Sequence, residues 1–247
     1  MRWNVEAENS RQRPRVFCAS MADVFEDRRD LDVHRERLWL LIDSTPHLDW
    51  LLLTKRPQNV AALAPWGTRW PENVWLGATI ENQKVADERM DDLAAIPARV
   101  RFVSAEPLLS ALDLRHWLGP KVHWVITGGE SGGKARPPNP TWFRSLRDQC
   151  QERGAAFHFK QWGEWVPASA SANGGRVQSR IVTDGAIMLR LGKKAAGREL
   201  DGRTWDELPT TKRTKPSRSS TTSPKAGEPS RRSSASKLLS GPKAKRA

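Results

Sequence analysis

The sequence contains little cysteine, no tyrosine and no long apolar run. Only Cys18 and Cys150 occur among its 247 residues, and two thiols so far apart predict neither a disulfide framework nor a cysteine metal site. No stretch approaches the roughly 18 apolar residues of a membrane-spanning helix, and the first residues lack the apolar core of a signal peptide. We therefore expect a cytoplasmic protein with no membrane partner.

Acidic residues are scarce near the end of the chain, and this shortage accounts for most of the formal net charge of +13. Residues 212–247 contain eleven Lys or Arg against the single Glu228, which leaves about +3 for the residues before them. This segment is poor in large apolar residues, so it cannot bury enough surface to offset its ordering entropy. We predict a disordered basic tail over 211–247. Such a tail binds nucleic acid through its charge or only keeps the protein soluble, and the sequence leaves both alternatives open.

Six short apolar runs are each followed by polar or charged residues, which is typical of buried parallel strands whose ends reach a site. The runs cover 15–20, 49–53, 74–78, 99–103, the stretch from 122 to the glycines at 128, and 155–159. Apolar residues at three- and four-residue spacing predict helices over 30–43, 82–96 and 140–153, with a shorter helix over 58–63. The helix over 30–43 is expected to bury the face formed by Leu31, His34, Leu38, Leu41 and Ile42.

The alternation of strands and helices predicts an α/β fold with parallel pairing. Polar residues at the end of every strand favour a barrel, whose site draws residues from many strands at one face. Six β/α units predict a partial TIM-like (β/α) barrel over 15–165, preceded by an irregular segment over 1–14. Residues 166–210 are expected to form an appended β-hairpin and a closing segment, because turn signals at 173–175 and 183–185 flank short apolar runs.

The residues at the ends of the six strands form the candidate ligand-binding set. In a parallel barrel the carboxyl ends of the strands meet at one mouth. The set comprises Asp23, Lys55, Arg56, Glu81, Asn82, Ser104, Glu106, Gly128, Gly129, Glu130, Ser131, Lys160, Gln161 and Trp162. No catalytic residue can be assigned among them from the sequence.

The two central carboxylates of this set have two interpretations. Glu106 and Glu130 follow neighbouring strands and suit a ligand's ammonium group or sugar hydroxyls. Alternatively, they are structural carboxylates that pair with Arg101 or Arg136, since ion-pair networks also fill barrel mouths.

The cations of the set also have two interpretations each. Lys55 and Arg56 directly follow a strand and suit a carboxylate or phosphate, unless they form a solvated turn. Lys160 has its stem among aromatic residues. It carries an ammonium group with a tuned pKa or is paired with Glu130 or Glu164.

The histidines and tryptophans give weaker signals. His123 and His158 lie within strands, and we interpret both as histidines of the core or of the outer face, since their spacing does not form a zinc site. Most of the twelve tryptophans lie in apolar runs and are expected to pack in the core. For Trp162 and Trp165, at a strand end, stacking on a sugar or base is the alternative.

Seven stretches in chain order carry a family resemblance: Val16–Phe25, Leu53–Pro57, Val74–Asn82, Arg101–Leu109, Trp124–Gly132, Phe159–Trp165 and Gly192–Arg198. They resemble the phage gp thirty-seven/gp sixty-eight family, uncharacterised proteins of phages and bacteria. The barrel of that family is similar to that of radical S-adenosylmethionine enzymes. The resemblance covers about residues 15–208.

The resemblance implies two cofactors, S-adenosylmethionine and a four-iron four-sulfur cluster. In the family, an earlier cysteine cluster would hold the iron–sulfur centre with three thiolates and leave one iron free to bind and cleave S-adenosylmethionine. Cys18 and Cys150 cannot replace it, so the cluster ligands are absent from this chain. We expect a displaced gene start, a truncated remnant, or a barrel that binds its ligand without cleaving it, and no radical chemistry by this chain alone.

Two functional hypotheses follow from the sequence. The first is a radical-enzyme-like barrel for a nucleic acid or nucleotide-related substrate in phage biology, which is an enzyme only if the missing cysteine segment is supplied. The second is a non-catalytic barrel that binds a small anionic or nucleotide-like ligand and contacts nucleic acid through residues 212–247.

Overall fold

The computed structural model describes residues 2–18, 22–170, 178–182 and 184–210. These residues belong to one compact unit that spans both the predicted barrel, 15–165, and the predicted appendage, 166–210. The predicted basic tail over 211–247 and the turn signal at 173–175 lie outside the described residues. Within the described ranges, no helix combines the length and the apolar character needed to cross a bilayer.

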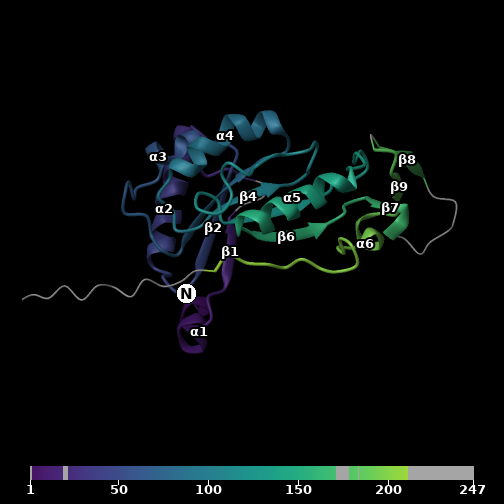
Figure 1. The fold of residues 1–247 in the computed structure, drawn as a ribbon. Coiled ribbons are helices and arrows are strands. Elements are labelled where there is room, and N and C mark those ends of the chain that lie inside the picture. Colours follow the sequence, from purple (N-terminus) through teal and green to yellow (C-terminus); the bar gives the residue numbers. More distant parts are fainter. Residues whose placement is uncertain (1, 19–21, 171–177, 183, 211–247) are drawn as a thin grey trace, which may run out of the picture. The chain divides into compact units, whose positions relative to one another are not determined.

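The centre of the fold is a curled sheet of six parallel strands that follow one another in chain order (Figure 1). Each strand pairs with its neighbours in sequence, and helices connect four of these five neighbouring pairs, all but β4 and β5. The structure therefore confirms the six predicted strands and gives an α/β half-barrel. The strands are β1 (Arg15–Cys18), β2 (Asp49–Thr54), β3 (Val74–Thr79), β4 (Arg101–Ala105), β5 (Trp124–Gly128) and β6 (Ala156–Gln161).

The four predicted helices between the strands are also confirmed. They are α2 (Asp32–Asp43), α3 (Val60–Leu63), α4 (Gln83–Ala95) and α5 (Pro140–Arg153), and the 3₁₀ helices η1 (Arg29–Leu31) and η2 (Pro57–Asn59) lead into α2 and α3. The Oδ1 atom of Asn82 caps α4 by accepting a hydrogen bond from Val85 N at 3.1 Å. Asn139 caps α5 in the same way, and Gly154, with φ +69°, ends it.

The buried face of α2 differs from the prediction. Arg35, Trp39 and Ile42 are buried, whereas Leu41 is 40% exposed. The guanidinium of Arg35 donates hydrogen bonds to the backbone carbonyl groups of residues 24, 26 and 28. Because the loop after β1 folds over the helix and its carbonyl groups need donors, Arg35 faces inward and the helix is rotated from the orientation that hydrophobicity alone predicts.

The N-terminal segment over 1–14, predicted to be irregular, contains helix α1 (Arg2–Ser10), so that prediction is wrong. Of the helix residues, Ala7 is buried, and no apolar stripe indicated the helix in the sequence. Polar contacts hold it in place instead. Asn4 Oδ1 accepts a hydrogen bond from His47 N at 2.9 Å, and His47 Nε2 lies 3.6 Å from Glu8 Oε1.

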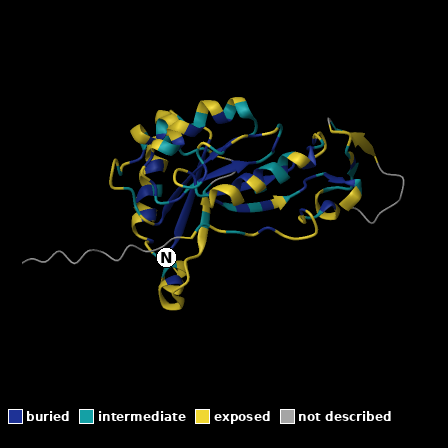
Figure 2. Ribbon diagram, in the orientation of Figure 1, coloured by how far each residue is buried: buried dark blue, intermediate teal, exposed yellow. Residues whose placement is uncertain are grey.

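The sheet buries apolar residues on both faces, because side chains alternate along each strand. On the face covered by helices, strand residues such as Leu52, Leu76 and Phe157 join a core with Met90 of α4 and Phe143 of α5. Figure 2 shows these central strands buried, while the outer sides of the helices are exposed. A separate cluster on the opposite, concave face consists of residues on or next to strands, namely Leu51, Leu53, Trp75, Val100, Phe102, Trp124 and Ile126.

After β6 the chain forms a smaller antiparallel sheet in the order β7-β9-β8. It comprises β7 (Trp165–Pro167), β8 (Ser179–Ile181) and β9 (Ile187–Arg190), with η3 (Ala168–Ala170) and α6 (Lys193–Ala196) beside it. The pair of β8 and β9 confirms the predicted hairpin, and β7 is an additional strand.

The last described residues then return along β6. Phe159 N donates to Trp205 O at 3.0 Å, and Glu207 N donates to Phe157 O at 3.2 Å. The β6 edge of the parallel sheet is thereby covered, which removes one site for aggregation.

Phe143 provides a test of the core on the helix side. Its ring centroid lies 5.1 Å from that of Phe159 and 5.3 Å from that of Trp162. We expect Phe143→Ala to lower the free energy of unfolding by about 3–5 kcal/mol, because it leaves a cavity among these rings. Urea titration followed by tryptophan fluorescence measures the change. The control Leu40→Ala, at a position 70% exposed on α2, should change it by less than about 0.5 kcal/mol, and equal effects of the two variants would contradict the assigned core.

Candidate functional site

The ends of the six strands bring the predicted residues to one edge of the half-barrel, where most of their charges are already paired. Asp23 ties the loop after β1 to the end of β2. Its carboxylate accepts hydrogen bonds from the Thr54 hydroxyl at 2.8 Å, Lys55 N at 2.9 Å, Arg56 Nη1 at 3.0 Å and Phe25 N at 3.0 Å. A carboxylate with four donors has little capacity left for a ligand, so Asp23 and Arg56 hold the two loops together.

Glu81 and Asn82, which follow β3, also have partners within the fold. Glu81 lies between Lys55 Nζ at 3.6 Å and Arg89 Nη1 at 3.5 Å. Asn82 is the N-cap of α4. Lys55 is the exposed member of this group, and its ammonium group remains accessible to a ligand.

Glu106 and Lys160 form an ion pair that spans β5. Lys160 Nζ lies 3.1 Å from Glu106 Oε2. A side-chain carbon at Gly128, on the intervening strand, would lie 2.7 Å from Glu106 Oε1. Glycine at this position therefore lets a carboxylate from the end of β4 meet an ammonium group on β6. The predicted pairing of Lys160 with Glu130 or Glu164 is wrong.

Glu130 pairs with Arg136, which is one of the two partners that the sequence suggested. The carboxylate accepts hydrogen bonds from Arg136 N at 2.9 Å, Nε at 2.8 Å and Nη2 at 3.1 Å. These hydrogen bonds lower the pKa of Glu130. The other suggested partner, Arg101, donates instead to the carbonyl oxygens of Ile96 and Ala98. Glu130 thus stabilises the glycine-rich loop after β5.

Two glycines allow the loops after β5 and β6 to lie backbone against backbone. A side-chain carbon at Gly129 would lie 1.9 Å from Trp162 O, and one at Gly163 would lie 2.2 Å from Glu130 O. The smaller sheet holds the same loop from its other side, because Arg190 of β9 donates to the carbonyl groups of the glycines at 132 and 133. The appendage therefore helps to position the end of β5.

The remaining predicted residues are also engaged in the fold. Trp162 is 2% exposed and Trp165 is buried, and each donates its indole N–H to a backbone carbonyl at 2.8 Å. Neither ring presents a face for stacking on a sugar or base. Gln161 Nε2 donates to Ser131 Oγ at 3.0 Å, which links the loops after β6 and β5.

A cavity of about 530 Å³ opens on the concave face of the half-barrel. Of the predicted residues, Ser104, Glu106 and Lys160 line it. The other lining residues were not predicted to belong to a site. Those that share a strand lie two positions apart, which places their side chains on the same side of that strand. These other lining residues are Arg15 and Phe17 of β1, Trp124 and Ile126 of β5, His158 of β6, and Asp206 and Leu208 of the returning segment.

Two residues that line this concave cavity carry a polar group without a hydrogen bond to the described residues. The indole N–H of Trp124 is buried and finds no acceptor among the residues that the structure describes. The guanidinium of Arg15, an exposed residue, forms no hydrogen bond or ion pair with them either. A buried donor without an acceptor costs about 1–3 kcal/mol, so a shift of the Trp124 ring that brings its N–H to a ligand acceptor in the cavity would recover this cost.

His158 lines the concave cavity, and its predicted place in the core or on the outer face is wrong. Its Nδ1 lies 3.4 Å from Asp206 Oδ1. Burial lowers the pKa of His158, which favours the neutral imidazole near pH 7. His123 is a satisfied structural histidine, as predicted, since its Nδ1 accepts the backbone N–H of Arg101 at 3.0 Å.

The described residues do not fit an iron–sulfur cluster. Cys18 ends β1 and Cys150 is buried in α5, and burial raises the pKa of both thiols, which disfavours the thiolate. A four-iron four-sulfur cluster with one open iron needs three thiolates, and the chain has two cysteines. In the described part of the chain, no group of three or more His, Cys, Asp or Glu side chains is placed to hold a metal ion.

Gly163 tests the close approach of the two loops. We expect Gly163→Ala to lower the free energy of unfolding by about 2–4 kcal/mol, because the new methyl group meets the Glu130 carbonyl at a residue with φ +81°. The control is Gly185→Ala, which has the same φ of +81° but nothing within 4 Å of the new carbon. It should cost only the backbone strain of about 1–2 kcal/mol. Urea unfolding measures both, and an equal loss would contradict the loop contact.

Comparison with known proteins places the chain in a family. No curated protein and no solved structure matches it. A family model described as "Protein of unknown function (DUF5131)" matches residues 1–209, which includes the half-barrel and the appended sheet. The chain therefore belongs to the DUF5131 family of proteins of unknown function.

Proposed function

We propose that the concave cavity binds a small anionic ligand with a planar ring system, of the nucleotide type. The observation that carries this proposal is the buried Trp124 N–H without an acceptor. The N–H itself is not exposed to the cavity, so a shift of the indole ring would bring it to a ring nitrogen or carbonyl oxygen of the ligand. Small-molecule sites are typically apolar clefts with a few polar groups that orient the ligand, and this cavity has that composition.

Arg15 supports the negative charge of the ligand. Its guanidinium forms no hydrogen bond or ion pair with the described residues and acts on the Asp49 carboxylate only at longer range, and a guanidinium matches the geometry of a carboxylate or phosphate. The other cation of the cavity, Lys160, is paired with Glu106. The unpaired charge is therefore positive.

Two aromatic residues support the planar ring. Phe17 is 45% exposed although its side chain is apolar, and it lines the cavity together with Trp124. Aromatic side chains stack on the faces of bases with a gain of about 1–3 kcal/mol per base. A planar heterocycle would cover the exposed Phe17 ring, which a small inorganic anion would leave in water.

Trp124→Phe tests the role of the indole N–H, with adenosine 5′-monophosphate as the probe. The variant keeps an aromatic ring but removes the donor, so binding of the probe should weaken about three- to tenfold. Isothermal titration calorimetry measures the affinity. Unchanged affinity would show that the N–H does not contact the ligand.

Arg15→Gln tests the charge with the same probe. We expect a loss of at least about tenfold, because a charged hydrogen bond to phosphate is removed. Arg153→Gln, which removes an exposed cation at the end of α5, is the matched control and should bind like the unchanged protein. If neither the protein nor its variants bind the nucleotide, or if both arginine variants lose affinity equally, the proposal fails.

S-adenosylmethionine is a second candidate ligand, which the family resemblance implies. The Glu106–Lys160 pair favours it, because a carboxylate and an ammonium group side by side complement the ligand's own ammonium and carboxylate groups. We propose binding without cleavage, since the chain has two cysteines and a cluster needs three thiolates. The phage setting and the contact of residues 212–247 with nucleic acid stay predictions.

Anaerobic reconstitution with iron and sulfide tests this second candidate. We expect no absorbance band of an iron–sulfur cluster, and S-adenosylmethionine recovered intact after incubation with a reductant. Glu106→Gln should weaken its binding, as measured by calorimetry, because the ligand's ammonium group loses its partner. Formation of a cluster or of cleavage products would overturn the proposal of binding without cleavage.

A further inference from the structure

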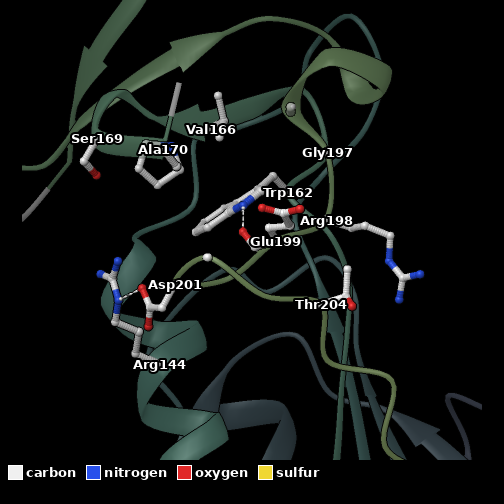
Figure 3. A pocket seen from close by; sticks show the side chains of 13 residues that line it. Arg144, Trp162, Val166, Ser169, Ala170, Gly197, Arg198, Glu199, Asp201 and Thr204 are labelled. Atoms are coloured by element: carbon white, nitrogen blue, oxygen red, sulfur yellow. Dashed lines mark hydrogen bonds and ion pairs between the residues drawn. The ribbon is translucent and has the colours of Figure 1, made fainter. Parts of the chain in front are cut away.

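We propose that a second cavity, beside β7 and α6, binds a small organic cation with an alkyl stem, and that Glu199 is its anionic partner. The cavity has a volume of about 540 Å³ and shares no lining residue with the concave cavity. Figure 3 shows Trp162 and Glu199 next to each other within it, with Arg144 and Asp201 at one side. The proposal is independent of the proposed function of the concave face.

Hydrogen bonds hold the wall that carries Glu199. Trp162 donates its indole N–H to Glu199 O at 2.8 Å and its backbone N–H to Gly197 O at 3.1 Å. Because the Trp162 ring is buried, these bonds anchor the segment from 197 to 199 to the core. The carboxylate of Glu199 is thus carried by a fixed backbone, which reduces the entropy that binding costs.

The charges that line the second cavity favour a cationic ligand, because the cations of the lining already have partners. Arg144 Nε donates to Asp201 Oδ1 at 2.8 Å, and Arg147 donates to the other oxygen of the same carboxylate. Arg198 is paired with Asp206. Each cation of the lining is therefore neutralised.

Glu199 is the charged lining residue that remains. Its carboxylate has no hydrogen bond or ion pair with the residues that the structure describes. A cationic ligand would neutralise it. An anion would meet this unpaired negative charge and would have to displace existing ion pairs.

The rest of the lining suits a short alkyl stem. Apolar side chains of β7, η3 and α6 line the cavity, namely those of Val166, Pro167, Ala170 and Ala196. The hydroxyl groups of Ser169 and Thr204 provide hydrogen-bond acceptors for further N–H groups. An alkylated guanidinium, which combines a flat cation with an apolar stem, fits both the carboxylate and these walls.

Butylguanidinium is the probe that tests the second cavity, and butylurea is its uncharged analogue of the same shape. In NMR titrations of the full chain, we expect saturable shifts of the indole N–H of Trp162 with butylguanidinium and none with butylurea. Glu199→Gln should weaken the binding at least about tenfold, because a charged hydrogen bond is lost. Glu88→Gln on α4, which removes the same charge from an exposed carboxylate elsewhere, should leave it unchanged.

A second variant tests the walls without changing any charge. Ala170→Phe places a ring in the cavity from an exposed position of η3 and should abolish the shifts, while a circular dichroism melt checks that the variant folds. Absence of binding to the unchanged protein would overturn the proposal. So would equal binding of both guanidinium and urea probes, or an equal loss in the Glu199 and Glu88 variants.

Discussion

A parallel sheet has apolar side chains on both faces, and each face must be covered. The packing of the six strands depends on this constraint. Helices α2, α4 and α5 cover one face. On the other, the sheet curls so that large side chains such as Trp75, Phe102 and Trp124 pack against one another. The concave cavity adjoins this second core and shares Trp124 and Ile126 with it, so the packing that stabilises the half-barrel also places the Trp124 indole beside the proposed site.

The charges at the strand ends serve mainly to hold the fold. Asp23, Glu81, Glu106 and Glu130 each have a cation or a backbone N–H as a partner. A carboxylate that leaves water needs such partners, because its desolvation is otherwise unfavourable. Residues near strand ends are therefore poor indicators of a site by themselves. Unpaired groups beside a cavity are better indicators, such as Arg15, the Trp124 N–H and, in the second cavity, Glu199. The N–H of Trp66 is also buried without an acceptor, but it lines neither of these cavities.

Continuous apolar runs predicted the six strands, most of which are buried on both faces. The helices between them were predicted from three- and four-residue periodicity, since burial of one helix face imposes that spacing. Periodicity failed for α1, which polar contacts such as that of Asn4 hold in place, and for the orientation of α2, where Arg35 faces inward to bind carbonyl groups. The site was predicted in part. Ser104, Glu106 and Lys160 do line the concave cavity, whereas Trp162 is buried in the core. The sequence could not show this burial, because a tryptophan next to a strand end gives no sign of which side is buried.

The sequence by itself determined the α/β class, the parallel order of the strands and the need for glycine after β5, because these depend on spacing along the chain. The tertiary structure alone decided which charges are paired. Lys160 meets Glu106 across Gly128, and the returning segment brings Asp206 and Leu208 to the cavity from far along the chain. Such contacts join residues that are distant in sequence, and their geometry follows from the curl of the sheet rather than from any local pattern.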